Sequence, residues 1–256
     1  MVTPATRGYT PNPGFGSGIF RRRIRLIAEH GQVRAALEDT SHAMRLIVRH
    51  DGGHVTDTQS RMTRIPLSTC PAADAPLRAF IGTPLVPYPV RANAQVNPRA
   101  NCTHLHHLAM LAIAHARRGG TRQYDIEVPD EHPDPVWATL RRDGAEVLRW
   151  QTLGGQLVGP GDHAGRPLLV GFARWAAERF EGEALEAAFV MQNGYFVSIS
   201  RRYDTDSWMG RPATSHQHMV GKCYSYQADV APHGVYHGDS TRDTTAPDTA
   251  LLDDFD

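Results

Sequence analysis

The sequence predicts an α+β fold in which two antiparallel β-meanders, each followed by helices, pack around a shared core. Side chains alternate between apolar and polar along residues 20–27 and 42–50, as in strands with one wet face. Between residues 51 and 53, Asp-Gly-Gly fits a hairpin turn, because glycine tolerates the positive φ that such turns need. Apolar residues in the segment 101–118 recur at spacings of three and four, as on one face of a helix.

The first half of the chain, residues 19–120, is expected to hold four strands and two helices. The strands are predicted at residues 20–27, 33–38, 42–50 and 55–65. Asp74 is a candidate N-cap for a short helix over residues 75–81, and Gly82 would end it. Residues 83–100 contain several prolines and are predicted to form a long loop before the second helix.

The second half, residues 121–238, repeats this order of elements. Strands are predicted at residues 123–128, 136–141, 146–152 and 156–158, and helices at 172–180 and from 183 to about 201. A closing strand is predicted at residues 222–227. The two halves share no sequence repeat, so the order of elements alone suggests that they form one compact unit.

Composition narrows the classes of function. The formal net charge is zero, which argues against nonspecific nucleic-acid binding. The chain has no apolar run of about 18 residues and no apolar signal segment, so we expect neither a membrane span nor secretion. Three well-separated cysteines fit the reducing cytoplasm. Residues 1–18 are predicted to be a mobile arm, and residues 239–256, with six aspartates, an acidic disordered tail.

The start of the helix at 101–118 carries the first candidate chemistry. Its core stripe is Leu105, Leu108, Ala112 and Ala116. Cys102 lies at the N-terminus, where the helix dipole should lower the pKa of a thiol. Cys102 and His104 are therefore either a reactive thiol with a base, two metal ligands, or an inert thiol beside a boundary histidine. His106 and His115 are expected on the surface.

His42 is the second candidate. It shares a predicted strand face with Met44 and Leu46, which should point into the core, so it would lie at the mouth of a pocket. A buried histidine needs a partner, and Asp39, three residues earlier, is placed to orient it. The alternative is a histidine at the core edge that is bonded to backbone.

Further cysteines and histidines offer metal-ligand alternatives. Cys70 precedes the first helix as Cys102 precedes the second, so the two thiols are a candidate metal or redox pair, with inert burial of Cys70 as the alternative. His216 and His218 would face the same side of a strand, and Cys223 follows five residues later. A zinc site from Cys70, Cys102, Cys223 and His104 is a further alternative, although its separations are unlike the short paired spacings of structural zinc sites. We expect no metal and no other cofactor.

Three motifs carry a family resemblance: His42-x-Met44, Cys70-Pro71, and the run Cys102-Thr103-His104-Leu105. With them the chain resembles a family of bacterial proteins known as a domain of unknown function, although Asn101 stands where the family usually has glycine. The similarity to longer members extends to GFARWAAERF and KCYSYQ, and so covers roughly residues 20–240. The resemblance implies that His42, Cys102 and His104 form a group of residues that members of the family share. It implies no particular reaction.

These observations favour an enzyme that acts on a small apolar organic substrate. The chain has no GxGxxG, GxxxxGK[ST], GxSxG or HExxH motif, so cofactor-independent acid–base chemistry is the simplest expectation. It would be a lyase of the hydratase or dehydratase type, or an isomerase. His42 and His104 would be acid and base, with Asp39 orienting and Cys102 supporting. The expected pocket walls are Met44, Leu46, Trp137, Trp150 and Trp175.

The alternative is a non-catalytic accessory protein that binds a small ligand or a metal. In both cases the expected partner is a small molecule, and binding to nucleic acid or to a membrane is not expected. A homo-oligomer is compatible with either function.

Overall fold

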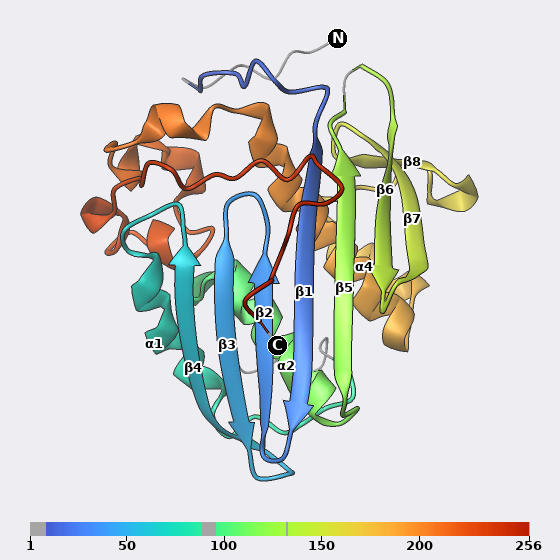
Figure 1. The fold of residues 1–256 in the computed structure, drawn as a ribbon, viewed down its shortest axis with the longest axis vertical. Coiled ribbons are helices and arrows are strands. Elements are labelled where there is room, and N and C mark those ends of the chain that lie inside the picture. The colour runs from blue at the N-terminus through green and yellow to red at the C-terminus, as the bar shows by residue number, and fades with distance from the viewer. Residues whose placement is uncertain (1–8, 89–95, 132, 256) are drawn as a thin grey trace.

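A computed structural model describes residues 9–88, 96–131 and 133–255. Eight strands form a single antiparallel sheet in the order β4-β3-β2-β1-β5-β6-β7-β8 (Figure 1). Their bounds are β1 (Ile19–Glu29), β2 (Gln32–Glu38), β3 (Ala43–His50), β4 (Val55–Arg64), β5 (Thr121–Pro129), β6 (Val136–Arg142), β7 (Ala145–Leu153) and β8 (Gln156–Gly159). The predicted α+β class and both meanders are confirmed.

The two meanders join through β1 and β5, the first strand of each. These strands pair antiparallel along their length, with Ile24 opposite Tyr124. Along β1 the residues Phe20, Arg22 and Ile24 are buried, whereas the residues between them are half-buried on the other face. The period of two that predicted a strand therefore also decides which of the arginines at 21–25 point inward.

Helices cover one face of this sheet (Figure 1). The helix α2 (Thr103–Ala116) packs on β1, β2 and β3, and α4 (Gly182–Ser198) packs on β5, β6 and β7. Gly194 allows α4 to approach the sheet closely, since a Cβ atom there would lie 2.7 Å from Ile126 Cγ2. The remaining helices are short: α1 (Asp74–Leu77), flanked by 3-10 turns, and α3 (Phe172–Arg179).

One hydrophobic core runs under both meanders. It includes Phe20 and Leu46 from the first half and Leu140 and Trp150 from the second, and the stripe residue Leu108 of α2 is fully buried in it. The prediction of a shared core is confirmed, because a single sheet offers one continuous apolar face to α2 and α4.

The predicted closing strand at residues 222–227 is wrong. This segment forms a 3-10 turn, Tyr224–Tyr226, within a region that continues in such turns from Ile199 to His233. Gly221 adopts a φ of 75°, and the Tyr224 N–H donates to Asn101 O at 3.0 Å rather than to a neighbouring strand. These local bonds replace the ladder that a strand would need.

The acidic C-terminal segment lies across the outer face of the sheet, drawn in red in Figure 1, rather than forming the solvated tail that its composition predicted. Arginines of β1 hold it: Arg21 Nη1 donates to Thr244 O at 2.7 Å and Arg25 Nη1 to Phe255 O at 2.7 Å. Leu252 and Phe255 are buried against Ala36. The wet face of β1 is thus covered, because its guanidinium groups find carbonyl acceptors in this segment.

At the other end, residues 1–8 of the predicted mobile arm lie outside the described residues. Residues 9–18 contact the body, where Asn12 N donates to Arg202 O at 3.0 Å and Gly18 N donates to Asp130 Oδ2 at 3.0 Å. Within the described part of the chain, every helix is too short or too polar to cross a lipid bilayer.

Docking of the C-terminal segment should contribute measurably to stability. Leu252 is 1% exposed, so Leu252→Ala should lower the free energy of unfolding by about 2 kcal/mol or more through lost burial and a residual cavity. Leu169→Ala is the matched control, since Leu169 is 40% exposed and should change stability by only about 0.5 kcal/mol. Equal, small effects in urea unfolding would show that the segment is not docked.

Candidate functional site

The candidate site is built on the turn that joins β2 to β3, residues 39–42. Asp39 Oδ1 accepts hydrogen bonds from the backbone N–H of Ser41 at 2.8 Å and of His42 at 2.9 Å. Its own N–H donates to His42 O at 2.9 Å. A short acidic side chain that accepts hydrogen bonds from the backbone two and three residues ahead stabilises such a turn. It therefore fixes the position of His42 at the end of the turn.

Asp39 also holds the imidazole of His42. Its Oδ1 lies 3.0 Å from His42 Nδ1, and both side chains are buried. Its Oδ2 accepts from Arg22 Nε at 2.9 Å and from Arg22 Nη2 at 2.5 Å. Burial alone would raise the pKa of Asp39, but Arg22 and then His42 outweigh burial and hold that pKa well below its ordinary value.

Arg22 was not among the residues predicted for the site, although the alternation along β1 indicates that its side chain points inward. Arg22 occupies the buried register of β1 between Phe20 and Ile24 and is 1% exposed. An arginine at a core position requires a carboxylate partner, because an unpaired buried charge is strongly unfavourable. That requirement predicts a buried carboxylate beside Arg22, and the structure supplies it in Asp39, which directly follows the neighbouring strand β2.

His104, in the first turn of α2, stacks on His42. The ring centroids are 3.9 Å apart, with 32° between the ring planes. Ligand atoms of Asp39, His42 and His104 all lie within 4.8 Å of one another. Burial, followed by the charges of His42 and Arg22, lowers the pKa of His104 well below its ordinary value, so His104 is an uncharged imidazole at neutral pH.

Cys102 is the N-cap residue of α2, with its Sγ 4.0 Å from His104 Nδ1. The sequence predicted that the helix dipole would lower the pKa of this thiol, and that expectation is wrong in sign. Cys102 is buried, and burial raises its pKa to about 12. Desolvation of a thiolate outweighs the dipole here, so Cys102 is a neutral thiol rather than a reactive thiolate.

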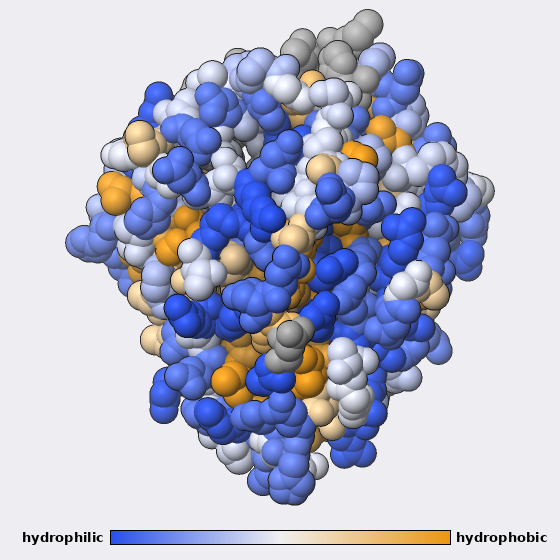
Figure 2. Space-filling view, viewed as in Figure 1, coloured by the Kyte–Doolittle hydropathy of each residue, from blue (hydrophilic) through white to orange (hydrophobic). Residues whose placement is uncertain are grey.

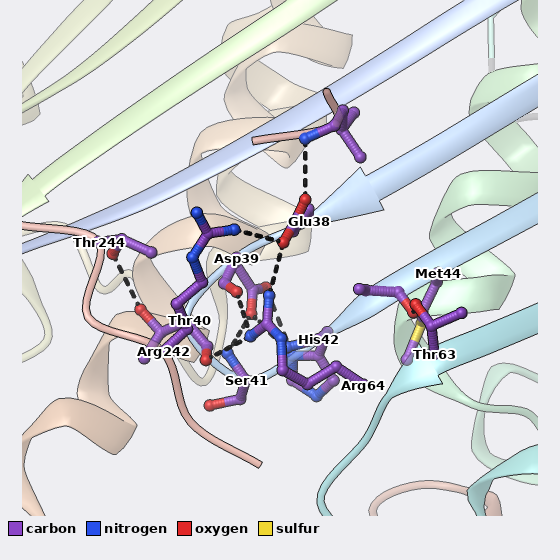
Figure 3. Close-up of polar contacts among 12 residues, drawn as sticks. Glu38, Asp39, Thr40, Ser41, His42, Met44, Thr63, Arg64, Arg242 and Thr244 are labelled. Carbon is purple, nitrogen blue, oxygen red and sulfur yellow. Dashed lines mark hydrogen bonds and ion pairs between the residues drawn. The ribbon is translucent and has the colours of Figure 1, made fainter. Parts of the chain in front are cut away.

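A second layer of charges fixes the turn from outside (Figure 3). Arg64 Nη1 donates to Asp39 O at 2.7 Å and to Thr40 O at 2.6 Å. Glu38 accepts from Arg64 Nη2 at 2.8 Å and from Arg242 Nη1 at 3.0 Å. The C-terminal segment therefore helps to hold the turn through Arg242.

The structure does not bring the predicted pocket walls together. Met44 and Leu46 are buried in the core beneath β3, with 1% of each exposed. Trp150 lies on β7, five strands away, which is roughly 24 Å at the usual spacing of strands. It packs on Trp175, at 6.2 Å between ring centroids, whereas Trp137 is exposed.

The other histidines of α2 are buried, so their predicted surface position is wrong. His106 is 5% exposed and its ring lies 5.2 Å from that of Phe80. His115 is 1% exposed, and its Nε2 lies 2.9 Å from Gly120 O. The helix has few exposed positions because the sheet covers one side of it, and α1 and the 3-10 turn Pro98–Ala100 also contact it.

The remaining metal-ligand candidates occupy a different region. His216 Nδ1 is hydrogen-bonded to Tyr236 Oη, and His218 Nε2 lies 2.7 Å from Tyr9 Oη. Their ring centroids are 6.2 Å apart and edge-on. The two histidines do not lie on a strand, so they do not present a pair of nitrogens at one point as predicted.

A polar hollow of about 430 Å³ lies beside the turn. Thr40 and Ser41 line it together with residues from the segments 12–18, 200–206 and 241–245. Serine and threonine hydroxyls, two arginines and three aspartates face this space. Figure 2 shows this face of the molecule as mainly hydrophilic, with smaller hydrophobic areas near the C-terminus.

The Arg22–Asp39 pair should control stability in a pH-dependent way. Asp39→Asn leaves Arg22 buried without an anion and should lower the free energy of unfolding at pH 7 by about 3–5 kcal/mol. The folded-state pKa of Asp39 is lowered, so its contribution is complete above the unfolded pKa, about 3.9, and is lost as pH falls towards the folded value.

Urea unfolding at several pH values checks this prediction. The difference between wild type and Asp39→Asn should be constant above about pH 5 and shrink below about pH 4. Asp57→Asn, which removes a half-exposed pair with Arg49, should change stability by less than about 1 kcal/mol. A difference for Asp39→Asn that is this small, or that does not vary with pH, would contradict the account.

Comparisons with known proteins found one family to which this part of the chain is similar. A search of curated proteins and a search of solved structures each found no match. Residues 25–117, which include His42, Cys70, Cys102 and His104, match one family model. The resemblance drawn from the three motifs is thereby confirmed: over these residues the chain is similar to the family described as "Protein of unknown function (DUF2889)".

Proposed function

We propose that this protein is a proton-transfer enzyme in which His42, oriented by Asp39, exchanges a proton with the substrate. The observation that supports the proposal is the buried chain of contacts from Arg22 through Asp39 to His42, with His104 stacked on the same ring. It has the form of an orienting carboxylate behind a histidine base. The reaction class that fits is a hydratase or dehydratase, or an isomerase.

In this proposal Asp39 holds Nδ1 of His42, which leaves Nε2 to face the substrate. The imidazole takes a proton from a water or from a carbon next to a carbonyl group, and returns one as the bond rearranges. Asp39 is anionic and balances the positive charge that His42 acquires. Arg22 keeps Asp39 anionic and in place, so it acts as a positioning residue.

In this proposal His104 and Cys102 support the position of the His42 ring and do not exchange protons with the substrate. Two imidazoles in contact do not both carry a proton readily, because like charges at that distance repel. Burial lowers the pKa of His104 well below its ordinary value, so His104 serves as a neutral wall that fixes the plane of the His42 ring. Cys102 packs beside His104 as a neutral thiol.

A metal ion held by Asp39, His42 and His104 fits this site less well. Both carboxylate oxygens of Asp39 already accept hydrogen bonds, and Oδ2 is paired with Arg22. A divalent ion about 5 Å from a guanidinium is repelled by roughly 7 kcal/mol at an effective dielectric constant of 20. With the charge of Asp39 already balanced, a single proton is a better match than a dication.

The substrate is proposed to be a small molecule with an activated double bond or its hydrated form. His42 keeps 9% of its side chain exposed and His104 is half-buried, so the site reaches solvent at an edge. The polar hollow beside Thr40 and Ser41 favours substrates that carry hydroxyl groups next to the apolar part. Three free thiols are consistent with a proposed location in the reducing cytoplasm.

Proton exchange into carbon-bound positions tests the proposal. The protein would be incubated in D₂O with a panel of small enones and β-hydroxy ketones, and deuterium uptake followed by NMR. Wild type should accelerate exchange or hydration of at least one member, and His42→Gln should reduce that rate about 10²-fold or more.

His54→Gln is the matched control, because His54 is exposed on the hairpin before β4 and should exchange at the wild-type rate. An exchange rate that survives in His42→Gln would remove His42 from the reaction. No exchange with any member of the panel would contradict the proposed class of substrate.

A further inference from the structure

The chain contains three cysteines, far apart in the sequence, and the fold gathers them at one place. The Tyr224 N–H donates to Asn101 O at 3.0 Å, which puts Cys223 beside the start of α2 and Cys102. Ser225 Oγ donates to Cys70 Sγ at 3.5 Å, which puts Cys70 beside the same 3-10 turn. All three thiols belong to the described residues and are free.

The environment of these thiols is apolar. Cys70 and Cys102 are buried and Cys223 is half-buried, and Cys223 packs against the hydrophobic cluster that contains Cys70. Burial raises the pKa of Cys102 to about 12 and that of Cys223 to about 11, and the neighbouring thiols raise both further.

We propose that Cys70, Cys102 and Cys223 bind one thiophilic metal ion, of which Zn²⁺ is the representative case. Each S–H bond breaks as a metal–sulfur bond forms, so binding one ion releases three protons to solvent. Thiolates are the ligands that zinc prefers in closed structural sites. The ion has a structural role and takes no part in the proton transfer proposed for His42.

The three thiols lie on three different elements of the fold, so an ion bound to all of them would link these elements. Residues 199–233 contain 3-10 turns but no α-helix and no ladder strand, so their backbone is weakly self-supporting. Cys223 lies in this region, whereas Cys102 begins α2 and Cys70 begins the turns that precede α1. A shared ion would fasten the irregular region to both elements, as metals do in folds with few regular elements.

Binding requires the thiols to draw closer. The three sulfur atoms do not meet the mutual 4.8 Å spacing that joins Asp39, His42 and His104. Metal–sulfur bonds of about 2.3 Å place sulfur atoms roughly 3.8 Å apart in a tetrahedron. The turn at Cys223 is the part best able to move, because its neighbours form no strand.

A fourth ligand position is available to water. Asn101, adjacent to Cys102 and 2% exposed, has a side-chain carbonyl oxygen with no hydrogen-bond partner among the described residues. A buried acceptor of this kind usually has a partner, and a water on the ion would supply one.

Cobalt is the probe for this site, because Co²⁺ bound to thiolates absorbs strongly in the near ultraviolet. The full chain, reduced and stripped of metal, should bind about one Co²⁺ with a thiolate-to-cobalt band. Cys70→Ser and Cys223→Ser should each weaken binding at least 10-fold. Thr56→Ala, at an exposed position of β4, keeps all three thiols and should bind as wild type.

The His42→Gln variant separates this inference from the proposed function: it should lose proton exchange and keep the cobalt band. The absence of the band in wild type at one equivalent of Co²⁺, or its persistence in both cysteine variants, overturns the proposal.

If the serine variants fail to fold by circular dichroism, thiol alkylation of wild type decides instead. Zn²⁺ should protect all three cysteines from iodoacetamide, as read by mass spectrometry. Alkylation rates that Zn²⁺ leaves unchanged overturn the proposal.

Discussion

The buried ion pair between Arg22 and Asp39 is the interaction on which the rest of the site depends. It links β1, the strand that joins both meanders, to the turn that carries His42. Replacing such a pair by apolar residues of similar volume is often neutral or stabilising, because desolvation offsets the attraction. The pair is therefore better explained by what it positions. Asp39 uses one oxygen for Arg22 and the other for the turn and the His42 ring, so fixing the carboxylate fixes the imidazole.

Much of the fold follows from local pattern. Alternation along β1 and β3 predicted the strands and their inward faces, and the stripe at Leu105, Leu108 and Ala112 predicted the core face of α2. The alternation along β1 also predicts that Arg22 points inward. It does not predict which carboxylate pairs with Arg22. Long-range pairing decides that, through the neighbouring strand.

Other features could not be predicted because they depend on what covers a surface. The acidic tail looked solvated by composition, yet the outward arginines of β1 bind its carbonyl oxygens. His106 and His115 looked like surface residues, yet α2 is enclosed on more than one side. Cys102 looked activated by a helix dipole, yet burial reversed the sign of its pKa shift. In each case tertiary burial overrode a local rule.

The tautomer and hydrogen bond of His42 test the central claim most directly. In ¹⁵N-labelled protein, NMR should show His42 with a proton on Nδ1, slowed in its exchange with water by the bond to Asp39 Oδ1. That proton should become fast-exchanging in Asp39→Asn. A resting His42 with its proton on Nε2, or an Nδ1 proton unaffected by Asp39→Asn, would contradict the claim that Asp39 orients His42.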